Sequence, residues 1–202
     1  MSRALALVAV VTLLTVGGAD AAAAQAATPA AFPFAPEPRE CTVAPRPIEE
    51  VVAVVGTPTP SSPPFVVPAG EPANAETAAA AVGTLRQVFA CANAGDYLRV
   101  YALFTDDYVR VFFAGTPLTP EVEAFLTAPP RPLPEEQRRV IVRFGEAQLL
   151  ADGRVGLPIV LDEPDDPRTE EPDYAILERV DGHWLVDEIH EDPAPSSATP
   201  AA

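Results

Sequence analysis

The sequence predicts an α+β fold in which an antiparallel sheet packs on helices, preceded by a signal peptide and a proline-rich arm. Two observations predict the helices and the sheet: apolar residues recur at helical spacing in residues 75–104, and two Asp-Gly turns separate strand-like runs in residues 139–190. A third, the change from an apolar run to a proline-rich stretch, predicts the segments before it. The expected segments are a signal peptide (1–24), the arm with a short docked segment (25–73), the α+β domain (74–191) and a disordered tail (192–202).

The first segment has the layout of a secretory signal peptide. Arg3 is its only early charge, an apolar run follows over residues 4–16, and small residues complete it. The apolar run is shorter than the roughly 20 residues that a membrane-spanning helix needs. We therefore expect a secreted or otherwise extracytoplasmic protein with no membrane contact after signal removal. The alternative is an uncleaved N-terminal anchor.

The charge balance excludes two classes of partner. The formal net charge is -16, and all 13 basic residues are arginine. A surface this acidic repels phosphate backbones and anionic headgroups, and no local basic patch offsets it. We therefore expect no nucleic-acid partner, and we interpret the acidity as a source of solubility outside the cytoplasm.

The chain has two cysteines, Cys41 and Cys91. An oxidising compartment favours a disulfide between them, which would tie the arm to the first helix. The alternative is that Cys91 is a buried free thiol. Neither cysteine has the CxxC context of a redox or metal site.

The arm is rich in proline, which favours extended chain, and residues 47–55 within it form one or two helical turns or a docked strand. Asn74 is the expected N-cap of the first helix, which ends at residues 93–95. Asp96 caps a second, shorter helix. One stripe of the first helix is apolar and should be buried: Ala81, Leu85, Val88 and Ala92, widened by Val82 and Phe89.

Residues 108–113 are β-branched and aromatic and are expected to form a strand. Thr119 and Pro120 open a third helix that runs through Leu126, and a proline-rich loop follows it. Runs 139–150 and 155–162, and then 174–180 and 184–190, predict two hairpins, for about five strands in all. The acidic loop 162–173 lacks the glycine and ligand spacing of a calcium loop, so we expect it to be solvated.

This order of elements resembles the nuclear-transport-factor-two-like superfamily, also called SnoaL-like, over about residues 75–191. Residues 93–97 and 103–109 carry the resemblance at the front, and residues 177–186 carry it at the back. It implies that the domain at residues 74–191 is an α+β cone, in which a cone-shaped, curved antiparallel sheet packs on the helices and encloses an apolar pocket. Similar proteins include isomerases, cyclases, hydrolases and dehydratases as well as non-catalytic binding domains, so the resemblance alone does not decide the function.

Several side chains are candidates for such a pocket. They are Tyr101, Phe104, Tyr108, Phe112, Arg143, Trp184 and Glu188. Acid-base chemistry would draw on Asp106 and Asp107 at the mouth of the expected strand, or on Glu146, His183 or His190. On the last strand, alternation places Trp184, Val186, Glu188 and His190 on one face and Leu185, Asp187 and Ile189 on the other, and it leaves open which face lines the pocket. If the Trp184 face lines it, Glu188 points into the pocket and can pair with Glu146.

No residue matches the catalytic sets of the enzymatic relatives, so no catalytic residue is assigned. With two histidines at no useful spacing, we expect no metal, and we expect no cofactor. Three functions stay open: a binder of a small apolar ligand or a protein partner, an acid-base enzyme of the SnoaL type, and a structural domain with a filled cone. The resemblance also implies a homodimer through the open sheet face, which the acidic surface and the proline-rich arm would oppose.

Overall fold

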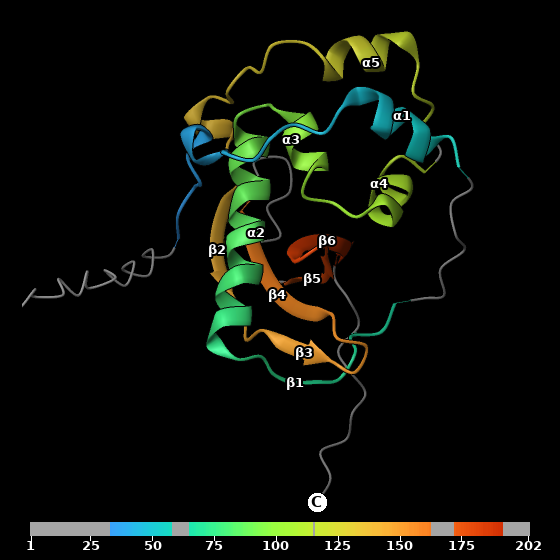
Figure 1. Cartoon of the computed structure of the whole chain (residues 1–202). Coiled ribbons are helices and arrows are strands. Elements are labelled where there is room, and N and C mark those ends of the chain that lie inside the picture. The colour runs from blue at the N-terminus through green and yellow to red at the C-terminus, as the bar shows by residue number, and fades with distance from the viewer. Residues whose placement is uncertain (1–32, 58–64, 115, 163–171, 192–202) are drawn as a thin grey trace, which may run out of the picture. The chain divides into compact units, whose positions relative to one another are not determined.

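The computed structural model describes residues 33–57, 65–114, 116–162 and 172–191 (Figure 1). The predicted signal peptide and the predicted tail from residue 192 onward lie outside these residues, as does most of the acidic loop. The described residues belong to one compact unit that extends from residue 31.

The fold is α+β, with a curved antiparallel sheet and several helices, as the sequence predicts. Its strands are β1 (Gly70–Pro72), β2 (Val140–Phe144), β3 (Gln148–Leu150), β4 (Val155–Asp162), β5 (Asp173–Val180) and β6 (His183–His190). The strands pair in the order β1-β3-β4-β5-β6, and β2 also pairs with β4. The described residues thus hold six strands where about five were expected.

Both predicted hairpins are present. Gly153 (φ +88°) turns the chain between β3 and β4, and Gly182 (φ +85°) turns it between β5 and β6. Both glycines lie in the left-handed region, where a side chain would be strained. The Asp-Gly signals therefore identify the turns correctly.

The run 139–150 is not one strand but two. Opposite the break lies Pro158 of β4, which has no N–H to donate to its neighbour. Gly145 packs closely on Pro158, and its N–H donates to the Pro158 carbonyl over 2.7 Å. Glu146 lies in the break between β2 and β3 and is exposed. The ladder therefore restarts only at β3.

Helix α2 (Ala75–Asn93) lies across one face of the sheet (Figure 1). Asn74 caps it by accepting from the Thr77 N–H over 2.9 Å. Asp96 caps α3 (Tyr97–Tyr101) in the same way. The predicted stripe of α2 is buried, as is the stripe of α3 at Val100 and Tyr101.

The expected strand at residues 108–113 is wrong, because residues 108–112 belong to helix α4 (Asp106–Phe112) and Phe113 is its C-cap. Thr105 is its N-cap and accepts from the Tyr108 N–H over 3.1 Å, and Asp106 and Asp107 occupy the first turn. Helical spacing buries Val109 and Phe113 together, which the strand interpretation overlooked. Tertiary packing overrides the β propensity of these residues.

The remaining helices lie on either side of α2 in the sequence. Helix α5 (Pro120–Leu126) has Thr119 as its N-cap, as predicted. Residues 47–55 contain a helix, α1 (Ile48–Val55), whose Val51 is fully buried in the main core. The proline-rich arm thus also contributes strand β1, which pairs with β3.

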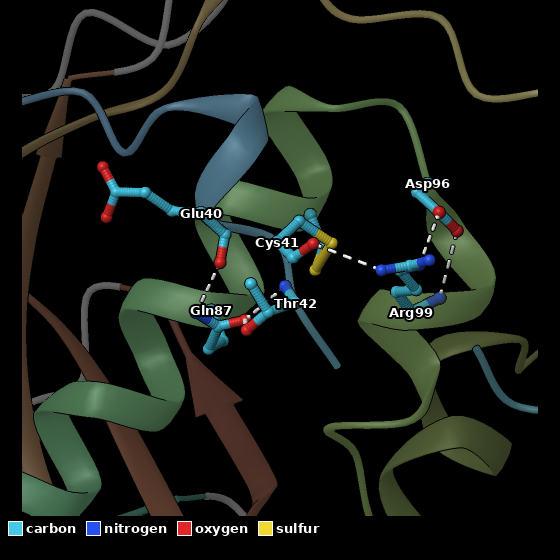
Figure 2. Close-up of a disulfide and its surroundings, with 7 residues drawn as sticks. Glu40, Cys41, Thr42, Gln87, Asp96 and Arg99 are labelled. Carbon is cyan, nitrogen blue, oxygen red and sulfur yellow. Dashed lines mark hydrogen bonds and ion pairs between the residues drawn. A yellow bond between two sulfur atoms is a disulfide. The ribbon is translucent and has the colours of Figure 1, made fainter. Parts of the chain in front are cut away.

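The predicted disulfide between Cys41 and Cys91 is present and ties the arm to α2. Figure 2 shows the contacts around it. The Gln87 side chain donates to the Glu40 carbonyl over 2.6 Å and accepts from the Thr42 N–H over 3.0 Å. The Arg99 guanidinium donates to the Cys41 carbonyl over 3.2 Å. The arm is therefore held on α2 and α3 by hydrogen bonds as well as by the disulfide.

The sheet has a different apolar cluster on each face. The main core lies between the helices and residues such as Leu157, Ala175, Leu177 and Val186 of β4, β5 and β6. The second cluster consists of Leu150, Tyr174 and Ile176, against which Phe65 and Val67 pack. This second sheet face is therefore partly covered by the chain's own arm.

None of the helices in the described ranges is both long and apolar enough to cross a membrane.

Candidate functional site

A cavity of about 240 Å³ lies between the helices and the sheet, within the main core. Helices α2, α3 and α4 form one wall, and strands β4, β5 and β6 form the other. The lining residues that bear on its chemistry are Tyr97, Tyr101, Phe104, Tyr108 and Phe112 on the helix side, and Ile159, Ala175 and Ile189 on the strand side. The walls are therefore apolar and rich in aromatic rings.

The structure brings four of the predicted pocket residues together here. The rings of Phe104 and Tyr108 meet edge to face with centroids 4.7 Å apart. The ring of Tyr101 lies 5.6 Å from that of Phe112 and 6.1 Å from that of Phe104. Tyr108 and Phe112 are four residues apart in α4 and so lie on one side of that helix. Phe104 precedes the N-cap of α4 and is held by a bridge to Val186 of β6. Phe112 is half exposed and borders the opening.

The phenols of Tyr101 and Tyr108 stay protonated. Burial raises the pKa of Tyr101 above its usual value, with a smaller contribution from Tyr97. Burial also raises the pKa of Tyr108, and the carboxylates of Glu191 and Asp173 raise it further. Both hydroxyls therefore remain neutral hydrogen-bond donors at any physiological pH.

The cavity has a charged end that the sequence interpretation missed. Asp173 and Glu191 line it there, near enough to Tyr108 to act on its phenol by charge, and Arg139 also lines the cavity. Asp173 lies opposite Ile159 across the β4–β5 pair, and Ala175 lies opposite Ile189 across the β5–β6 pair, so Asp173 shares the helix-covered face. Because side chains two residues apart on a strand share a face, the apolar Ala175 and Leu177 could have indicated from the sequence that Asp173 also faces the core.

Glu188, in contrast, does not line the cavity. A β-bulge leaves Asp187 without a partner, because Val186 pairs with Leu177 while Glu188 pairs with Ile176. One extra residue reverses the alternation beyond it, so Glu188 faces the second cluster although Trp184 and Val186 face the main core. The prediction that Trp184 and Glu188 share a face is therefore wrong.

Glu188 instead belongs to a charged network on the second face. The Arg154 guanidinium donates to Glu188 over 2.6 Å and to Asp187 over 2.8 Å. Glu188 also bonds His190 over 2.6 Å, and the His190 ring stacks on Phe65. Hydrogen bonds from His190 and Arg154 hold the pKa of Glu188 below its usual value in spite of burial. Glu188 is therefore an ionised structural partner in this network and no acid for the cavity.

The other predicted residues are also outside the cavity lining. Arg143 is exposed on β2, and Trp184 packs against the main core without lining the cavity. Glu146 cannot pair with Glu188, because β4 and β5 separate their strands in the sheet. His183 is exposed in the turn before β6.

Asp106 and Asp107 have structural partners at the start of α4. Asp106 accepts from Arg46 over 2.5 Å, which ties α4 to the arm, and Asp107 pairs with Arg110 over 2.5 Å within the helix. They lie in the first turn of a helix, where the helix dipole favours carboxylates. The structure thus places them at a helix start and not at the mouth of a strand.

Metal binding has no support in the described ranges, where no three His, Cys, Asp or Glu side chains gather in a way that could hold an ion. The volume of the cavity instead limits the size of the molecule that it can bind. An apolar cavity of about 150 Å³ binds benzene, and drug-sized sites begin at about 300 Å³. A cavity of about 240 Å³ can therefore take a molecule of one or two rings.

Comparison of the chain with protein-family models, with curated proteins and with solved structures finds no match.

Proposed function

We propose that this chain is an exported domain of the nuclear-transport-factor-two-like (SnoaL-like) type that binds a small apolar molecule inside its cone. The observation that carries the proposal is the cavity of about 240 Å³ with aromatic walls. A structural domain would fill this space with its own side chains, because protein interiors are close-packed and an empty apolar cavity is destabilising. An apolar ligand restores the missing contacts.

The position of the cavity supports the assignment to a cone. It lies between a curved antiparallel sheet and helices that precede the sheet in sequence, which is where the resemblance implies a pocket. Export is supported by the Cys41–Cys91 disulfide, since such bonds persist in oxidising compartments.

The second candidate is an acid-base enzyme. The observation in its favour is the charged end of the cavity, where Asp173 and Glu191 lie beside the buried Tyr108. A carboxylate and a phenol at one end of an apolar cavity can move a proton on a bound molecule. Conversion of a bound compound during the binding experiments below, followed by chromatography, would favour the enzyme over the binder.

The binding proposal is tested by calorimetric titration of the protein with indane, a two-ring hydrocarbon. From a typical free energy per ligand atom, we expect a dissociation constant on the order of 0.1 to 1 mM. Ala92→Leu places three carbon atoms into the cavity from α2 and should abolish binding while the protein stays folded. The matched control is Ala80→Leu, the same change on the exposed side of α2, which should bind indane as the wild type does.

Two results would contradict the proposal. One is a folded wild-type protein that shows no heat of binding and no rise in melting temperature with indane. The other is equal binding by Ala92→Leu and the wild type, since the ligand would then occupy another place.

A further inference from the structure

The aromatic surface of the cavity continues beyond its opening. Phe112 of α4 lines the cavity and is 52% exposed, so it lies where the cavity wall meets the protein surface. Tyr97 at the start of α3 also lines the cavity and is half-buried. Phe125 of α5 is 62% exposed, and its ring lies 5.4 Å from that of Tyr97. Aromatic rings thus run from the wall of the cavity to the outer surface of α5.

Phe125 is the most exposed large apolar side chain among the described residues. Helix α5 packs against the core through Val122 and Leu126, so its docking does not require the ring of Phe125. A phenylalanine ring left in water forgoes most of the free energy that its burial would supply. A ligand that covers this ring would recover part of that free energy.

The cavity itself can hold only part of a longer ligand. Benzene fits an apolar cavity of about 150 Å³, so a cavity of about 240 Å³ holds about ten carbon atoms in proportion. A longer molecule can enter with one end, and its other end must then leave through the opening. The rings of Phe112, Tyr97 and Phe125 are the apolar surfaces available to it there.

We propose that the ligand is an elongated, rod-shaped apolar molecule with more than about ten carbon atoms, such as an aryl polyene. One end fills the cavity, and the other end lies on the exposed rings of Tyr97 and Phe125. This inference rests on the proposed binding function and adds to it the length and shape of the ligand.

Two hydrocarbons test the inference on the wild-type protein. Indane fits inside the cavity, whereas diphenylhexatriene is a rod with about twice as many carbon atoms as indane, and it fluoresces strongly only in apolar surroundings. We expect diphenylhexatriene to bind at least about tenfold more tightly than indane, because its outer half adds contacts with aromatic rings. Indane should displace it in a fluorescence titration, because both compounds occupy the cavity.

Variants assign the outer contact to Phe125. Phe125→Ala should weaken the binding of diphenylhexatriene about 3- to 10-fold and leave the affinity for indane unchanged. Phe125→Tyr keeps the ring and should bind both compounds as the wild type does. The control is Leu149→Ala, which truncates an exposed apolar side chain that does not line the cavity and should change neither affinity.

The outcomes separate the two proposals. If indane does not bind the wild-type protein, the binding function fails, and the inference fails with it. If indane binds but diphenylhexatriene binds no more tightly, or if indane does not displace it, the binding function stands and the inference about ligand length is overturned. The inference is also overturned if Phe125→Ala binds diphenylhexatriene as the wild type does, or if Leu149→Ala weakens its binding as much as Phe125→Ala.

Discussion

The side chain of Asn93 connects three parts of the chain, and its removal should destabilise the fold strongly. Asn93 is fully buried at the end of α2. Its amide nitrogen donates to the Pro36 carbonyl over 3.0 Å and to the Arg139 carbonyl over 3.2 Å, and its amide oxygen accepts from the Arg139 N–H over 2.9 Å. One side chain thus joins the arm, α2 and the chain entering β2.

The expected loss for Asn93→Ala follows from these contacts. Three hydrogen bonds at about 1 kcal/mol each give about 3 kcal/mol, because the backbone groups that remain are left without their partner. The higher helix propensity of alanine returns at most about 0.7 kcal/mol. We therefore expect the free energy of unfolding to fall by about 2 to 3 kcal/mol, and the melting temperature to fall by about 4 to 12 °C.

Urea denaturation followed by circular dichroism measures this loss. The control is Asn74→Ala, which removes one exposed hydrogen bond at the other end of α2 and should cost about 1 kcal/mol. Asn93→Asp keeps the acceptor for the Arg139 N–H but turns a carboxylate toward two carbonyl oxygens, so it should be at least as destabilising at neutral pH. If Asn93→Ala costs no more than Asn74→Ala, the connecting role of Asn93 is refuted.

Three further predictions concern the disulfide, the second sheet face and the cavity. Cys41→Ala should lower the free energy of unfolding by about 4 kcal/mol, because the disulfide closes a loop with a sequence separation of 50 residues. The arm should still resist protease in the folded protein, because Val51 stays buried in the core. Rapid cleavage of the arm would contradict this expectation. Gly156→Ala should lower the free energy of unfolding in urea by about 1 to 3 kcal/mol, because its new methyl group overlaps the buried Tyr174 phenol. The loss should be smaller in a Tyr174→Phe background, which lacks the hydroxyl. An equal loss in both backgrounds would exclude a clash with the hydroxyl. Because burial raises the pKa of Tyr108 in the folded state, the contribution of its phenol to stability is complete below a pH of about 10 and is lost as the pH rises further. A Tyr108→Phe variant should therefore lose less stability between pH 9 and pH 11 than the wild type. Equal losses in the two proteins would show that the pKa of Tyr108 is not raised by folding.

The local sequence was sufficient to predict three of the helix caps and both hairpin turns. Asn74, Asp96 and Thr119 cap the helices that they were expected to cap, and Gly153 and Gly182 form the predicted turns. These features depend on a few neighbouring residues, whose side chains and backbone angles act within one turn of chain. The apolar stripe of α2 was equally predictable, because helical spacing repeats over many residues.

The identity of α4 was decided by tertiary packing. Residues 108–112 suit a strand by propensity, but Thr105 caps a helix there and its turns bury Val109 and Phe113 against the core. Over so short a segment, burial contributes more free energy than β propensity. This change also determines the site, because the helix places Tyr108 and Phe112 around the cavity, beside Phe104.

The charged end of the site was decided by register. Alternation along the last strand assumed an unbroken ladder, and the bulge at Asp187 moves Glu188 to the other face. A bulge depends on the partner strand and on the segment that packs beside it, here the backbone of residues 103–105 bonded to Val186. Sequence alone thus determined the class of fold, the caps of α2, α3 and α5 and the two hairpin turns, and it favoured the disulfide that the structure contains. The tertiary structure decided which carboxylates line the cavity, because one inserted residue reverses every side chain beyond it.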